Sequence, residues 1–118
     1  MVKIRAYIGE ATEYDKKETL EERRPKSWLK SVSAFANGNG GVLLFGVADD
    51  DALKGLPDVK TASEKISEAV KSKMDPIPSI ELQIRQEEGK DFILLHVAPG
   101  AETPYYYIGD GGRIAYVR

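Results

Sequence analysis

The stretch "SAFANGNGGVLLFGVADD" ends in Asp49 and Asp50, and a third aspartate, Asp51, follows it. It holds four glycines, two asparagines and a run of large apolar residues. Glycine-rich turns can bind phosphates through backbone amides, and clustered carboxylates can bind divalent metal ions. The same residue types also form ordinary turns with solvated acids. The stretch therefore allows three interpretations: a phosphate-binding loop, a metal site, or a tight turn that leads into a buried strand.

The order of the predicted elements argues against the phosphate-binding loop. Such a loop leads from a strand into a helix, and in the ATP-binding motif a Lys-Ser or Lys-Thr pair directly follows the glycines. Here residues 25–37 carry an apolar stripe at helical spacing, and the glycines then lead into an apolar strand at residues 42–47. We expect no ATP binding, and we interpret Asn37-Gly38 as a helix stop.

The other elements follow from periodicity. Residues 61–74 predict a second helix, with the spacing of a capping box from Thr61 to Glu64. Apolar alternation predicts one hairpin over residues 80–99 and another over residues 103–118. Residues 3–10 are interpreted as a short strand and residues 11–25 as a loop or exposed extended segment. The fold class expected is α+β, a mixed β-sheet with two helices packed against it.

Composition limits the class of protein. A chain of 118 residues with 42% hydrophobic residues is the size of one domain, here residues 1–118. It has no cysteine and one histidine, His96, so it has neither a disulfide framework nor a His-rich zinc site. Its apolar runs are too short to span a bilayer, and no signal peptide is visible, so we expect a cytoplasmic protein without membrane contact. The sequence stops inside a predicted strand, which suggests a module of a longer protein with further C-terminal domains.

Charge is distributed unevenly along the chain. The net charge is −2, but residues 1–30 hold eight basic and six acidic residues. Basic clusters contact the phosphates of nucleic acids, although they also form solvated surfaces. The candidate phosphate contacts are Lys16, Lys17, Arg23, Arg24, Lys26 and Lys30, together with Arg113 and Arg118 of the last hairpin. Tyr105 to Tyr107 could stack on bases, but an edge or interface role is favoured, and His96 is interpreted as a partly buried structural residue.

The central stretch resembles the hallmark segment of the Schlafen-type AlbA_2 domain, also called divergent AAA-4. The positions that carry this resemblance are Ala34-Phe35-Ala36-Asn37, Gly40-Gly41, Gly46-Val47, Asp49 and Gly55. The C-terminal signature of the family matches Pro104, Tyr105 and Tyr116-Val117-Arg118. The N-terminal signature, Glu followed five residues later by Glu-aromatic-Lys, matches Glu10 and Asp15-Lys16-Lys17, with Asp in place of Glu and Lys in place of the aromatic residue. An alternative register uses Glu13-Tyr14.

The resemblance implies nucleic-acid binding, as in the DNA-binding modules of bacterial transcriptional regulators and helicase-like proteins. Some Schlafen proteins cleave RNA with a metal-dependent trio of acids, which here would be Glu10, Asp15 and Asp49. These carboxylates would serve as catalytic residues and as ligands of Mg²⁺ or Mn²⁺, whereas a binding module needs no cofactor. The shorter Asp15 side chain argues against catalysis. The expected function is DNA or RNA binding without catalysis. The alternatives are a metal-dependent nuclease and a protein-interaction module. Exposed sheet edges and the resemblance to the family together suggest a homodimer.

Overall fold

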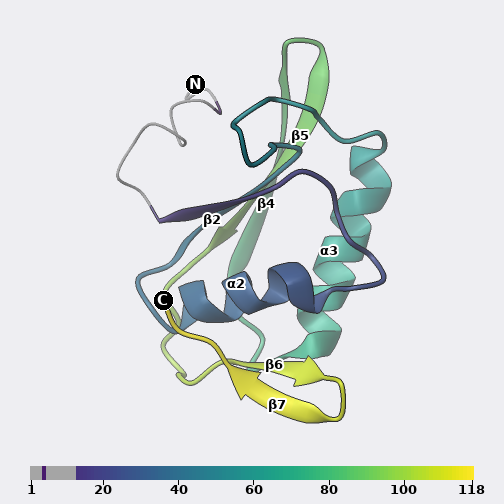
Figure 1. Cartoon of the computed structure of the whole chain (residues 1–118). Coiled ribbons are helices and arrows are strands. Elements are labelled where there is room, and N and C mark those ends of the chain that lie inside the picture. The colour runs from purple at the N-terminus through teal and green to yellow at the C-terminus, as the bar shows by residue number, and fades with distance from the viewer. Residues whose placement is uncertain (1–3, 5–12) are drawn as a thin grey trace.

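The computed structural model describes Ile4 and residues 13–118 (Figure 1). In this part of the chain the elements are β1 (Tyr14–Lys17), α2 (Lys26–Ala36), β2 (Gly41–Phe45), α3 (Val59–Lys73), β3 (Met74–Asp75), β4 (Ile80–Glu87), β5 (Lys90–Val97), β6 (Tyr106–Gly109) and β7 (Gly112–Ala115). They form an α+β fold with two helices and mixed sheets, which confirms the predicted class. No helix among the described residues combines the length and apolar character needed to cross a membrane.

The strands form two separate sheets. The larger has the order β1-β2-β5-β4, in which β1 runs parallel to β2 and the other neighbours are antiparallel. The smaller has the order β3-β6-β7, so the last hairpin pairs with the short strand that follows α3. Figure 1 shows this hairpin below α2, at the end of the molecule away from the turn between β4 and β5. The pairing of the hairpin with β3 was not predicted, because no local pattern marks a two-residue strand.

The central strand β2 is covered on both faces, as its continuous apolar run predicted. Leu43 and Phe45 point into the core beneath the two helices, together with residues of α2, α3 and β5. Val42 and Leu44 point to the opposite face and pack with Phe92, Leu94 and Ile4, among others. The strand ends at Phe45 rather than at residue 47, because Val47 forms an isolated bridge with Leu53 in the following turn.

Helix α2 begins and ends where the sequence predicted. Pro25 is its N-cap and Asn37 its C-cap, and the stripe Trp28, Leu29, Val32, Phe35 and Ala36 is buried. The stop differs from the prediction in one respect. The left-handed residue is Gly40, with φ of 81°, and not Gly38. The backbone amides of both glycines bond to the Phe35 carbonyl.

Two local predictions are wrong. The segment 11–25 contains the strand β1, which pairs along one side with β2 and has four half-buried residues; its polar composition hid this edge position. The backbone at Ile4 is helical, so the predicted strand 3–10 is wrong at that residue and otherwise lies outside the described residues.

Helix α3 is capped by Asp58 rather than by Thr61. Its carboxylate accepts a hydrogen bond of 3.1 Å from the Thr61 N–H, and the helix starts at Val59, two residues before the predicted start. The capping box is therefore wrong, whereas the inward positions Ala62, Ile66 and Val70 are buried as predicted. Hydrogen bonds from the side chain and then the backbone of Thr61 lower the pKa of Asp58.

Removing this cap should lower the melting temperature in a pH-dependent way. The folded-state pKa of Asp58 lies below its unfolded value of 3.8, so the stabilisation is present above that value and is lost as the pH falls through the folded-state pKa. We expect Asp58→Ala to lower the melting temperature by a few degrees at neutral pH and by almost nothing in strong acid. Thermal unfolding by circular dichroism measures both, and Glu64→Ala, which removes the other residue of the predicted capping box, should show no such loss. Equal loss in both variants would contradict the assignment.

Candidate functional site

A basic hollow of about 420 Å³ lies between the first turn of α2 and the β6–β7 hairpin. Four of the eight predicted phosphate contacts line it. The lining residues are Arg23, Arg24, Pro25, Lys26, Ser27, Lys30, Tyr107 and Asp110. The structure thus brings together cations that come from the segment before α2 and from the first two turns of the helix. Four positive charges face a single acidic side chain in this lining.

The electrostatics of this hollow favour an anion. A helix N-terminus carries a partial positive charge, which acidic residues normally offset, but the first turn of α2 contains none. Cations at this end add to the helix dipole, and among the described residues none of the four forms an ion pair. The cluster therefore opposes local stability, a pattern typical of functional sites. A bound anion would offset both contributions.

Two residues of the lining carry hydroxyl groups that the sequence did not mark as phosphate contacts, and one of them, Tyr107, is buried rather than free to stack on bases. The Ser27 hydroxyl is buried and has no hydrogen-bond partner among the described residues, so it can donate to a ligand oxygen. Burial raises the pKa of the Tyr107 phenol, and Asp110 raises it further while Lys26 lowers it. Tyr107 is therefore a neutral hydroxyl close to charged groups of both signs. The sequence feature that could have indicated this site is a helix that starts directly after a proline and has basic residues at its start.

A hydrogen-bond network fixes the hairpin against α2 and so sets the shape of the hollow. The Asn37 amide donates to the carbonyl oxygens of Tyr105 and Tyr116, each at 3.0 Å, and its oxygen accepts from the Tyr105 N–H at 2.6 Å. The buried Ser33 hydroxyl donates to the same Tyr105 carbonyl at 2.8 Å and accepts from the Tyr116 N–H at 3.0 Å. Two side chains at the end of α2 thus hold the hairpin on both sides.

Three of the other four predicted phosphate contacts are engaged in ion pairs. Lys16 binds Asp51, which raises the pKa of the Lys16 ammonium, and it also donates to the Asp49 carbonyl. Arg113 binds Asp75 and lies over the Tyr106 ring, 4.7 Å from its centroid.

Arg118 also forms ion pairs within the chain. It bonds Glu13 and Asp15, each at 2.9 Å, and it lies over the Phe35 ring. Lys17 is half-buried at the end of β1 and lies outside the lining of the hollow. These four residues are placed away from the basic hollow or held by internal partners, so they contribute less to a shared binding surface.

The acidic trio is only partly described. Glu10 lies outside the described residues. Asp15 lies on β1 and forms an ion pair with Arg118. Asp49 lies in an exposed turn, where the neighbouring Lys16 reaches its carbonyl. Because adjacent strand residues point to opposite faces, Asp15 and Lys16 diverge, and Asp15 points away from the side on which Lys16 meets Asp49. Within Ile4 and residues 13–118, no three acidic or histidine side chains form a metal-binding group.

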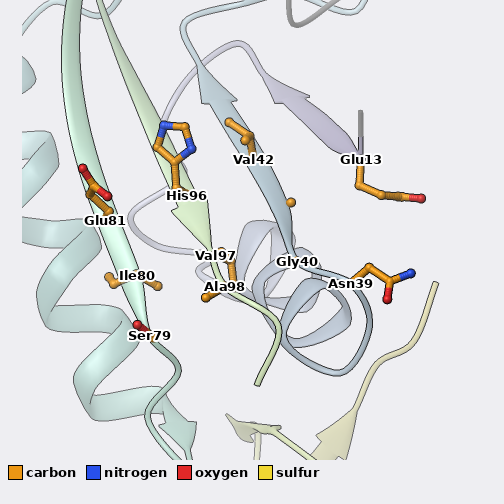
Figure 2. Close-up of a pocket in the computed structure, with 11 residues that line it drawn as sticks. Glu13, Asn39, Gly40, Val42, Ser79, Ile80, Glu81, His96, Val97 and Ala98 are labelled. Carbon is orange, nitrogen blue, oxygen red and sulfur yellow. The ribbon is translucent and has the colours of Figure 1, made fainter. Parts of the chain in front are cut away.

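A second hollow, of about 440 Å³, lies at one end of the larger sheet. Figure 2 shows Glu81, His96 and Val42 on three neighbouring strands, with Glu13 and Asn39 on the other side of Val42. His96 is half-buried beside Gln83, with 3.3 Å between Nε2 and Oε1, which agrees with its predicted structural role. Glu13, the acid of the alternative register, lines this hollow, but Asp15, Asp49 and the candidate phosphate contacts do not. Its two acidic side chains make it unsuited to a polyanion.

Comparisons with known proteins place the chain in a family. The family model described as "Schlafen, AlbA_2" matches residues 10–118. The N-terminal domain of an ATP-dependent DNA helicase RecG-related protein from Nitrosomonas europaea is 26% identical, with a TM-score of 0.69, over 92% of this chain and 78% of that one. The DIP2311 protein of Corynebacterium diphtheriae is 15% identical with a TM-score of 0.56; 87% of this chain matches 21% of that one, which shows the fold alone. No curated protein matches. The chain belongs to the Schlafen AlbA_2 family.

Proposed function

We propose that the chain binds nucleic acid through its phosphate backbone at the basic hollow, as a binding module without catalysis of its own. The observation that carries this proposal is the gathering of Arg23, Arg24, Lys26 and Lys30 at the positive end of α2. Lys and Arg side chains and helix N-termini are common donors to backbone phosphates. Because the net charge is −2, the attraction must come from this local cluster of cations rather than from the protein as a whole.

The similarity to known proteins supports nucleic acid as the ligand over other anions. The family is that of the AlbA_2 domain, and the solved relative is named as the N-terminal domain of a protein related to a DNA helicase. A polyanion can also meet several cations of the hollow at once, since successive phosphates are spaced along a strand. By the same kinship, we propose that the chain acts as one module of a longer cytoplasmic protein of the regulator or helicase-associated type.

Removing two cations from the hollow should weaken binding about tenfold and reduce its salt dependence. In Lys26→Ala/Lys30→Ala, the plot of log affinity against log salt should lose a slope of about 1.4 to 1.8, because each lost phosphate contact contributes about 0.7 to 0.9. Fluorescence anisotropy with single-stranded and duplex DNA and RNA, over a salt series, measures both quantities.

A matched control separates the effect of the binding site from the effect of the change in net charge. Lys60→Ala/Lys65→Ala makes the same charge change on α3, outside the lining of the hollow. It should leave the slope almost unchanged. The proposal would be overturned if the unmodified chain caused no change in anisotropy with any of the four nucleic acids at low salt. It would also be overturned if both double variants lost the same affinity. Absence of any salt-dependent binding would instead favour the protein-interaction module.

Metal-dependent cleavage stays a prediction for Glu10, Asp15 and Asp49. The same titration with added Mn²⁺ tests it, because a nuclease would convert the labelled strand to shorter products and Asp49→Ala would prevent this. The described residues give the trio no support, since an arginine holds Asp15.

A further inference from the structure

The hydroxyl group of Tyr107 is a donor without an internal acceptor in the basic hollow. The residue is only 3% exposed, yet it belongs to the lining of the hollow. Its hydroxyl lies against the backbone of Gly109, where an added Cβ would overlap it, and it forms no hydrogen bond with any other described residue. Because buried hydroxyl groups are normally hydrogen-bonded, an acceptor in the hollow, from solvent or from a ligand, must complete this one.

Side chains, and not the backbone, are the donors that this end of α2 offers. The N–H groups of Ser27 and Trp28 are already bonded to the Arg24 carbonyl at 2.9 Å and to the Pro25 carbonyl at 3.2 Å. The Ser27 hydroxyl, in contrast, has no partner among the described residues. An anion in the hollow therefore meets the cations and Ser27 on the α2 wall and the Tyr107 hydroxyl on the hairpin wall.

An anion that meets both walls at once must offer free oxygens on two sides. An internal phosphate of a nucleic-acid strand has two free oxygens, and the strand continues from each of the other two. A terminal phosphate has three free oxygens and a single link to the strand. It also carries about 1.5 to 2 negative charges at neutral pH, whereas an internal phosphate carries one. Both differences favour the terminal group in a hollow with two walls.

Asp110 limits the path that a strand can take through the hollow. It is the one acid of the lining and lies in the two-residue turn between β6 and β7, on the wall opposite the four cations. Figure 1 shows this turn on the side of the molecule where α2 begins. A strand that continued past the hairpin would bring its next phosphate towards this carboxylate, and the two negative charges would repel each other. A strand that ends in the hollow avoids this repulsion.

We propose that the basic hollow binds the terminal phosphate of a nucleic-acid strand, with the Tyr107 hydroxyl donating to one of its oxygens. The next phosphates of the strand then lie along the exposed cations of the α2 wall, Arg23, Arg24 and Lys30. This inference rests on the proposed nucleic-acid binding and specifies which part of the strand the hollow holds. The same phosphate chemistry occurs at the 5′ and the 3′ end, so both ends enter the test.

Competition between strands of one sequence measures the preference for a terminal phosphate. Unlabelled single strands carry a 5′-phosphate, a 3′-phosphate or hydroxyl groups at both ends, and each displaces an internally labelled, hydroxyl-ended strand from the protein. We expect one of the phosphorylated strands to compete at about tenfold lower concentration than the hydroxyl-ended strand.

Tyr107→Phe removes only the hydroxyl group and should reduce this preference to about threefold or less, with the affinity for the hydroxyl-ended strand unchanged. Tyr106→Phe is the matched control, because it makes the same change on the next residue of β6, which points to the opposite face and lies outside the lining. It should keep the full preference.

Asp110→Asn tests the path of the strand. Asparagine tolerates the positive φ of 52° at this turn position, so the hairpin is kept while the negative charge is lost. The affinity for the hydroxyl-ended strand should rise more than the affinity for the phosphorylated strand, because internal phosphates then gain access to the hollow.

The outcomes separate this inference from the function on which it rests. If the hydroxyl-ended strand competed as well as both phosphorylated strands, the inference would be wrong and the proposed nucleic-acid binding would stand. An unchanged preference in Tyr107→Phe, or an equal loss in Tyr107→Phe and Tyr106→Phe, would also overturn it. Absence of binding to every strand would overturn both.

Discussion

Asn37→Ala is expected to lower the free energy of unfolding by about 3 kcal/mol, because it removes three hydrogen bonds worth about 1 kcal/mol each. The Asn37 amide bonds both the Tyr105 and the Tyr116 carbonyl, and its oxygen bonds the Tyr105 N–H. Alanine leaves the backbone groups of the hairpin without these partners. Because the partners are 68 and 79 residues away in sequence, the loss falls on tertiary structure rather than on the helix.

Urea unfolding measures this loss as a shift of the midpoint at unchanged slope. Asn39→Ala is the matched control, since Asn39 lies two residues along in the same exposed turn and no hydrogen bond of its side chain joins it to another described residue. Asn37→Ala should also weaken nucleic-acid binding, because the hairpin that carries Tyr107 and Asp110 loses its attachment to α2. Losses of the same size in both variants would refute the role of the network.

Gly40→Ala is expected to cost about 3 kcal/mol as well, for a different reason. Gly40 has φ of 81°, a conformation that costs an L-residue about 1 kcal/mol. An added Cβ would also lie 2.7 Å from the Val97 carbonyl oxygen and 2.9 Å from the Pro99 Cδ. Neither neighbour is a flexible side-chain end, so the clash adds about 2 kcal/mol.

Gly89→Ala separates these two contributions. Gly89 has a similar φ of 71°, but nothing lies within 4 Å of an added Cβ. We expect it to lose only about 1 kcal/mol in the same urea experiment. If Gly40→Ala were no worse than Gly89→Ala, the close approach between the glycine turn and the end of β5 would be unimportant, and the glycines of the central stretch would serve conformation alone.

The tertiary structure decided which basic residues are available to contact phosphates. Lys16 and Lys30 are equally basic in sequence, but Asp51 holds Lys16, whereas Lys30 faces the basic hollow. Arg118 was predicted as a phosphate contact, yet it bonds Glu13 and Asp15, which lie more than 100 residues earlier in the chain. An ion pair between distant residues leaves no trace in local charge, so the sequence could not separate the two kinds of cation.

The sequence by itself determined the elements that depend on local periodicity. The buried stripe of α2, the apolar run of β2 and the alternation of the β4–β5 hairpin each needed only neighbouring residues, because side-chain direction repeats with the helix or strand. Edge strand β1 and the two-residue β3 were missed, since their stability comes from partners elsewhere in the chain.

Only the tertiary structure decided the meaning of the motif residues. Asn37 was predicted as a helix stop and the following glycines as a tight turn into the strand. Asn37 does end α2, but its side chain also binds the last hairpin, and Gly40 also accommodates the end of β5. The acids at the far end form a turn in which Asp50 bonds the Ala52 N–H and Asp51 bonds Lys16. The physical reason is that hydrogen bonds and close contacts depend on distance in space, which periodicity along the chain does not encode.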